Sequence, residues 1–168
     1  MTIIIQAKKI IESLSQMKEQ PASVSGKYHF GETLLEHTER CVSIMYNICD
    51  SLNIQESDRE MLVASAYLHD IGKVLITRKG HEDLSCWKYF SKTGYSRIDA
   101  FMHLHPILSA VMLDDFELDR KEEIKRLVSV HMGHWYKECP QPETLYEKLI
   151  VLADYLAYQK ELFNYKEK

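Results

Sequence analysis

A His-Asp pair, His69 and Asp70, follows the apolar run that ends at Leu68, and a second aspartate, Asp154, lies inside the apolar segment 151–157. Burying an unpaired carboxylate is costly in free energy. A cation that binds both carboxylates and the neighbouring imidazole would remove this cost, and imidazole with carboxylate is a donor set for transition metals. The sequence therefore predicts a metal-dependent enzyme.

Four candidate ligands fall on the apolar faces of four different predicted helices. Apolar residues recur at helical spacing around His37, His69, His131 and Asp154, so each of these side chains is expected to face inward. A single inward-facing histidine is more often a core residue than a ligand, but four such residues on four helices favour a shared site. These donors suit Mn, Fe, Co, Ni or Zn, and the residue types do not choose among these metals.

The elements that must position these residues are helices, because apolar residues recur at helical spacing along most of the chain. We expect an all-α fold, a compact single-domain bundle of about six or more helices. The segment 71–105 is less periodic, and no pair of alternating segments predicts a sheet. The expected helices cover residues 3–20, 34–52, 58–70, the stretch that starts at Pro106, 124–131 and the stretch after Pro142.

The composition of the chain limits the number of domains, the cellular compartment and the binding partners that we expect. The 168 residues, 45% of them hydrophobic, suffice for one domain with a real core. A formal charge of -4 offers no general attraction for a nucleic-acid backbone. The four cysteines show no Cys-x-x-Cys spacing, and no basic leader or membrane span is evident, so we expect a protein of the reducing cytoplasm without a membrane partner.

Three motifs in order resemble the HD-domain metal-dependent phosphohydrolases. They are Leu-Leu-Glu-His-Thr at 34–38, Leu-His-Asp-Ile-Gly-Lys at 68–73 and Leu-Ala-Asp at 152–154, and the resemblance covers roughly residues 29–157. It implies a stand-alone HD-type helical domain spanning 1–168, on which the N-terminal helix 3–20 packs. It also implies that the metal ligands are His37, His69, Asp70 and Asp154.

Many members of this family carry two further histidines, and His105 and His131 look like those positions. They would allow two divalent transition-metal ions bridged by Asp70, in place of one. His81 and His103 are alternatives for the additional ligand. His105 is favoured over them because a helix with an apolar face is predicted to start directly after it.

The resemblance also implies a mechanism, in which a metal-bound hydroxide is the nucleophile that attacks phosphorus. Asp70 would bridge two metals or orient the water. Lys73 is the best candidate for a catalytic and substrate-binding cation, followed by Arg40, with His81 as a further substrate-binding residue. The alternatives are a solvated helix-end lysine for Lys73 and a surface ion pair with a neighbouring glutamate for Arg40.

The leading hypothesis is a phosphohydrolase that cleaves a phosphate ester or anhydride of a nucleotide or of another small phosphorylated substrate. One alternative is a regulatory HD module that binds metal and ligand without turnover. Another is a nuclease or RNA-end phosphatase, which the acidic balance of the chain disfavours. The apolar N-terminal helix is compatible with a homodimer.

Overall fold

The computed structural model describes residues 1–23, 31–76 and 83–159 of the chain. Within these ranges the regular structure is helical, and the β-type pairing is limited to an isolated antiparallel bridge between Pro21 and Thr33. The prediction of an all-α fold is confirmed.

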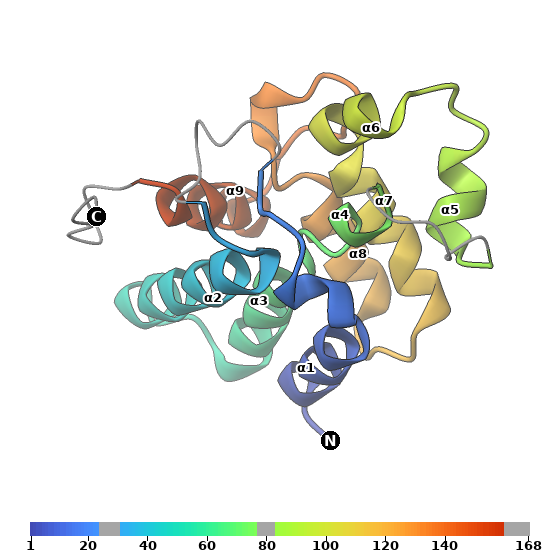
Figure 1. Cartoon of the computed structure of the whole chain (residues 1–168). Helices are drawn as coiled ribbons and strands as arrows, with labels where there is room; N and C mark the ends of the chain where they lie inside the picture. The colour runs from blue at the N-terminus through green and yellow to red at the C-terminus, as the bar shows by residue number, and fades with distance from the viewer. Residues whose placement is uncertain (24–30, 77–82, 160–168) are drawn as a thin grey trace.

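The helices form a bundle in which α3 lies in the middle and packs against α1, α2, α8 and α9 (Figure 1). On its other side α8 packs against α7, which also contacts α5. The α-helices are α1 (Ile3–Ser13), α2 (Leu34–Ser51), α3 (Glu56–Leu68), α4 (Lys73–Ile76), α5 (Ser85–Phe90), α6 (Arg97–His103), α7 (His105–Met112), α8 (Lys121–Ser129) and α9 (Leu145–Ala157), and the 3-10 turns are η1 (Ser15–Lys18), η2 (Leu113–Asp115) and η3 (Gly133–Trp135).

Two of the long helices begin with a capping box. Thr33 accepts a hydrogen bond from the backbone N–H of Glu36 at the start of α2, and the Glu36 carboxylate accepts one from the N–H of Thr33. Thr144 and Glu147 form the same pair at the start of α9. Each box satisfies donors that the first turn leaves without an intrahelical partner, and so fixes where the helix begins.

The structure departs most from the expected boundaries in two places, while α3 and α8 begin and end two or three residues before the expected positions. The expected N-terminal helix 3–20 ends at Ser13, because Leu14 leaves the helical region with a ψ of 79°, and the separate turn η1 follows. The weakly periodic segment 71–105 holds three short helices, α4, α5 and α6, within its described part. Helices this short show too few apolar repeats to give a periodic signal.

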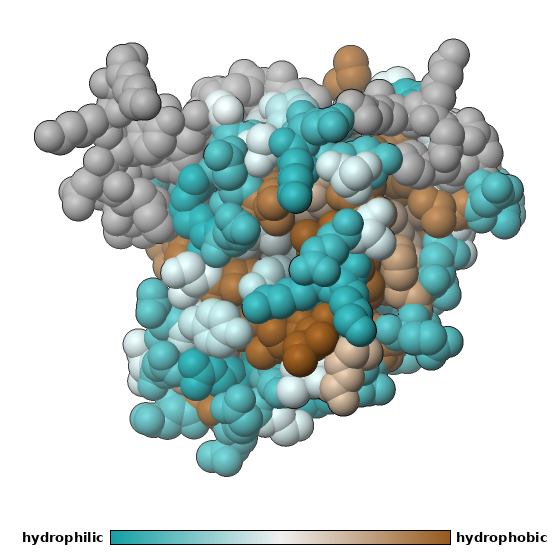
Figure 2. Space-filling view, turned by 60° about the horizontal axis from the view of Figure 1, so that its bottom comes forward, coloured by the Kyte–Doolittle hydropathy of each residue, from teal (hydrophilic) through white to brown (hydrophobic). Residues whose placement is uncertain are grey.

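The core consists of large apolar side chains from nearly all helices, including fully buried Leu34, Met45, Leu62 and Ile150. Hydrophilic side chains surround a smaller hydrophobic area on the face shown in Figure 2. All four cysteines are buried and free. In the described ranges no helix is long and apolar enough to cross a membrane.

Candidate metal centre

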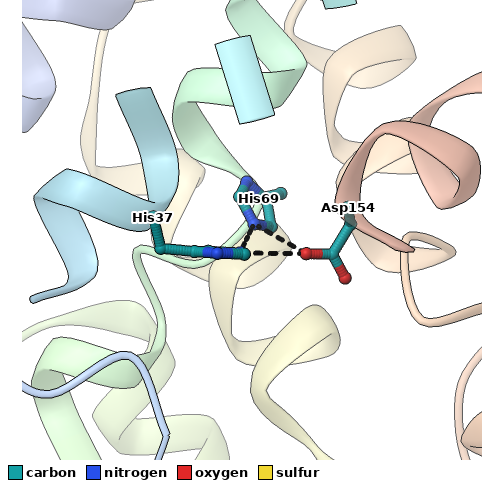
Figure 3. Close-up of side chains that lie close together, drawn as sticks. All are labelled: His37, His69 and Asp154. Carbon is teal, nitrogen blue, oxygen red and sulfur yellow. Dashed lines mark hydrogen bonds and ion pairs between the residues drawn. The ribbon is translucent and has the colours of Figure 1, made fainter. Parts of the chain in front are cut away.

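Three side chains from three helices meet at the centre of the bundle. His37 comes from the first turn of α2, His69 directly follows α3, and Asp154 lies in the last turns of α9 (Figure 3). The Nε2 atom of His37 is 3.0 Å from Oδ1 of Asp154 and 3.4 Å from Nε2 of His69. The Nε2 atom of His69 is 3.6 Å from the same carboxylate oxygen. These atoms could hold a metal ion together.

Asp70 connects this group to a second pair of histidines. Its Oδ2 atom lies 3.4 Å from Nε2 of His69 and 3.8 Å from Nε2 of His37. Its Oδ1 atom lies 3.1 Å from Nε2 of His105 and 3.5 Å from Nε2 of His131. We call His37, His69 and Asp154 with Oδ2 the first half of the centre, and His105 and His131 with Oδ1 the second half.

The second half brings together atoms that can only accept. The Nε2 atoms of His105 and His131 are 3.0 Å apart. The Oδ1 atom of Asp70, which faces both, is buried and makes no hydrogen bond with any residue that the structure describes. Lone pairs that converge in a buried site need a cation between them, so this orphaned oxygen fits a metal ion.

Backbone carbonyls fix the orientation of three of the rings. The Nδ1–H groups of His69, His105 and His131 each donate to a carbonyl 2.7 Å away, on Ala66, Phe101 and Val128 respectively. A carbonyl can only accept, so Nδ1 carries a proton in each ring, and whenever the imidazole is neutral its Nε2 atom presents a lone pair to the centre. Such bonds orient the histidine ligands of metal sites.

Carboxylates dominate the electrostatics of the first half. Burial alone would lower the pKa of His69, but Asp70 and Asp154 outweigh burial and raise this pKa to about 10. The pKa of His37 is also raised, because hydrogen bonds with Asp154 and Glu32 oppose the effect of burial. Burial works against ionisation of Asp154, yet bonds with the two imidazoles hold its pKa well below the usual value.

In the second half the pKa of a histidine is lowered, whereas both histidines of the first half have raised pKa values. Burial, helped by the positive charge of Lys73, lowers the pKa of His105 to about 3 in spite of the nearby Asp70 carboxylate, whose Oδ1 atom is 3.1 Å from Nε2 of His105. Burial opposes ionisation of Asp70, but Lys73 and the neighbouring imidazoles hold its pKa well below the usual value. Asp70 is thus an anion at neutral pH and His105 a neutral base, which is the state that metal coordination requires.

The Lys73 ammonium group is buried beside the centre rather than solvated. Its Nζ atom donates to Oδ2 of Asp70 at 2.7 Å and to the carbonyl of Ala22 at 3.1 Å. It also lies 5.3 Å from the centre of the Phe101 ring. Lys73 therefore compensates part of the negative charge of the first half, and its role toward a substrate stays a prediction.

Arg40 makes contacts that tie the start of α2 to the end of α9. Its guanidinium group forms an ion pair with Glu32 and donates to the carbonyl of Ala157 at 2.9 Å. Glu32 is buried, and its other carboxylate oxygen is 3.5 Å from Nδ1 of His37. The partner of Arg40 is thus a buried carboxylate of the centre, and its substrate-binding role stays a prediction.

Gly72 allows the turn after Asp70 to pack closely against α7, the helix that carries His105. Its N–H donates to Oγ of Ser109 in α7 at 2.8 Å. A Cβ atom at position 72 would lie 2.5 Å from the backbone nitrogen of Ser109 and 2.9 Å from the carbonyl oxygen of His105. Only glycine allows the turn after Asp70 to approach α7 this closely, and this approach places His105 beside Asp70.

Of the two alternatives to His105, the structure describes His103 alone. His103, in the last turn of α6, is exposed, and its ring contacts Tyr136 rather than the centre. His81 lies outside the described residues, so its predicted roles stay predictions. Of the two histidines that the structure describes, His105 is the one that the fold brings to the other candidate ligands.

Two residues near the centre escaped the sequence predictions. Glu32 lies outside the helical pattern that includes His37, and no periodicity connects them. Tyr136 follows η3, and its ring packs edge-on against His105 with centroids 5.3 Å apart. The only sequence signal was the short aromatic run Trp135-Tyr136 shortly after His131.

An all-α bundle that buries four histidines and two aspartates with converging lone pairs defines a helical domain with a metal-binding type of centre. The family model described as "HD domain" matches residues 34–159. The chain therefore belongs to the HD-domain family, whose members are generally metal-dependent hydrolases. No curated protein and no solved structure matches the chain significantly.

Proposed function

We propose that this protein is a metal-dependent phosphohydrolase acting on a small phosphorylated substrate. The observation that carries the proposal is Asp70, whose two carboxylate oxygens each face a pair of imidazole nitrogens. A carboxylate shared between two such pairs suits a binuclear site, and paired metals favour reactions at phosphorus.

The residues that would hold two divalent ions divide between the halves. His37, His69, Asp154 and Oδ2 of Asp70 would bind one ion, and His105, His131 and Oδ1 of Asp70 the other. Bound metal lowers the pKa of water and so supplies hydroxide near neutral pH. The mixed nitrogen and oxygen donors favour Mn, Fe, Co, Ni or Zn over Mg or Ca.

The protein's own groups would orient and neutralise the reactants. Asp70, ionised and held by Lys73, keeps a fixed negative charge between the halves. Lys73 would contribute a positive charge close to the phosphoryl oxygens of the substrate. Asp154, ionised and in contact with both histidines of the first half, would keep a second fixed negative charge at the first ion.

The net charge of the chain guides the substrate class that we propose. The formal charge of -4 disfavours a strand of nucleic acid, so we propose a nucleotide or a similar small phosphate ester or anhydride, acted on in the cytoplasm. The regulatory module without turnover remains the competing function. The full set of ligand-type residues at the centre favours an enzyme over that module.

The test is a turnover screen on metal-free protein reloaded separately with Mn, Fe(II), Co, Ni or Zn. Nucleotides and general phosphate esters are supplied, and released phosphate or nucleoside is measured. We expect turnover with at least one metal, lost in His69→Ala and retained in His134→Ala. His134 is a matched control because it is exposed and bonds to Gln141.

Two results would contradict the proposal. Tight binding of metal and of a phosphorylated ligand without turnover on any substrate would favour the regulatory module. Binding to single-stranded nucleic acid that weakens steeply with salt, together with strand cleavage, would favour the nuclease.

A further inference from the structure

Tyr136 forms a wall of the metal centre that the family assignment leaves without a role. Its ring packs against His105, with ring planes at 82°, and also contacts His103, with centroids 5.7 Å apart. His105 is itself fixed by the carbonyl of Phe101. The ring therefore has a defined place beside the second half of the centre and next to the end of α6.

The backbone around Tyr136 is also held in place. Its carbonyl accepts hydrogen bonds from the side-chain amide of Gln141 at 3.1 Å and from the N–H of Cys139 at 3.3 Å. The preceding turn begins at Gly133, where φ is +55° and a Cβ atom would lie 3.0 Å from Val151 of α9. The segment that carries Tyr136 is thus preorganised against the helix that carries Asp154.

The hydroxyl group of Tyr136 is available to a ligand. The residue is half-buried, and within the described ranges its hydroxyl has no hydrogen-bond partner. Burial, followed by the charges of Asp70 and Asp154, raises the pKa of Tyr136. The edge-on contact of the ring with His105 places Tyr136 beside the second half of the centre, and a tyrosine hydroxyl can donate a hydrogen bond.

We propose that the Tyr136 hydroxyl donates a hydrogen bond to a phosphoryl oxygen of the substrate bound across the two halves. This inference rests on the proposed function. Lys73, a buried cation beside the centre, already donates to Asp70 and Ala22. A neutral donor on the side of His105 would complement Lys73, because phosphoryl oxygens accept several hydrogen bonds. A neutral hydroxyl supplies such a bond without adding a further charge to the buried site.

Inorganic phosphate is the probe for this contact. Its affinity for the metal-loaded protein is measured by calorimetry for the wild type, for Tyr136→Phe and for Tyr46→Phe, with metal content determined on the same samples. Tyr136→Phe keeps the ring and removes only the hydroxyl. Tyr46 is the matched control, because it lies nine residues after His37 in α2, about 14 Å along the helix.

We expect Tyr136→Phe to weaken phosphate binding about tenfold or more, the effect of losing one hydrogen bond to a charged group. Metal content should be unchanged, and Tyr46→Phe should bind phosphate as the wild type does. Equal phosphate affinity in wild type and Tyr136→Phe, at equal metal content, overturns this inference alone. A metal-loaded wild type that fails to bind phosphate overturns the proposed function and the inference with it.

Discussion

The two halves of the centre use the same kinds of side chain but differ in charge. The first half combines two histidines with Asp154 and the nearby Glu32, and its imidazoles have raised pKa values, that of His69 reaching about 10. In the second half two histidines share one oxygen of Asp70, and the pKa of His105 falls to about 3.

The difference shows how the fold surrounds the two oxygens of one carboxylate with electrostatically unlike environments. The first half satisfies its buried carboxylates with protonated imidazoles and Lys73. Among the residues that the structure describes, no lysine or arginine makes such a contact with the second half, so its nitrogen and oxygen atoms are left facing one another. We therefore expect the first half to stay intact without metal and the second half to depend more strongly on it.

The largest expected effect comes from removing the bridge that both halves share. Asp70→Ala should reduce the metal content from about two ions per chain to nearly none, because each half loses an oxygen ligand. Turnover should fall on the order of 10³-fold or more. Elemental analysis and turnover assays on the same preparation measure both effects.

His105→Ala provides the matched comparison, since this residue belongs to the second half only. It should remove about one ion per chain and leave the first half loaded. Loss of both ions in His105→Ala would mean that the halves are not separate sites. Full retention of metal in Asp70→Ala would show that the bridge is not a ligand.

An intermediate effect is expected at the junction between the halves. Gly72→Ala would force a Cβ atom into the backbone of α7, so we expect the free energy of unfolding to fall by about 3 kcal/mol. Ser109→Ala, which removes only the hydrogen bond to Gly72, should cost about 1 kcal/mol. Chemical denaturation of the metal-free proteins measures both.

The metal content of Gly72→Ala gives a second test of the difference between the two halves of the centre. The Gly72→Ala displacement acts on α7, which carries His105, because the atoms nearest to the added Cβ are backbone atoms of that helix. The second half should therefore lose its ion first. An equal loss from both halves, or no change in stability, would contradict this account of Gly72.

The sequence predicted those features of the fold and of the centre that follow from the helical spacing of apolar residues. Apolar spacing identified the helices that carry His37 and Asp154, and the all-α fold follows from the same periodicity. The inward direction of these side chains could be predicted because a helical face fixes it, and both are buried.

What the sequence could not provide were contacts between segments without periodicity. The approach of Gly72 to α7 depends on backbone atoms far apart in the chain. The contact of Glu32 with His37 joins a residue before α2 to one within it. The burial of Lys73 depends on the carbonyl of Ala22, and a lysine at the start of a short helix gives no signal that it points inward.

The smallest expected effect concerns an ion pair that joins α8 and α9, the helices next to the two halves. The Nε group of Arg126 donates to Glu147 at 2.8 Å. This hydrogen bond, with those from the N–H groups of Glu143 and Thr144, lowers the pKa of Glu147 from 4.5 to about 2 against the effect of burial. A pKa lowered on folding stabilises the protein above the unfolded value, and this stabilisation is lost as pH falls from about 4.5 toward 2.

Glu147→Gln should therefore cost about 1 kcal/mol at neutral pH, or less because the Arg126 side chain is 40% exposed, and the difference from wild type should shrink as the medium is acidified. Denaturation at several pH values measures this difference, with the exposed Glu122→Gln as the control expected to change little. Metal content should not change, because the ion pair lies at the start of α9, whereas Asp154 lies in its last turns. Loss of metal in Glu147→Gln would mean that the two halves are positioned by the contact between α8 and α9, and not by Asp70 and Gly72.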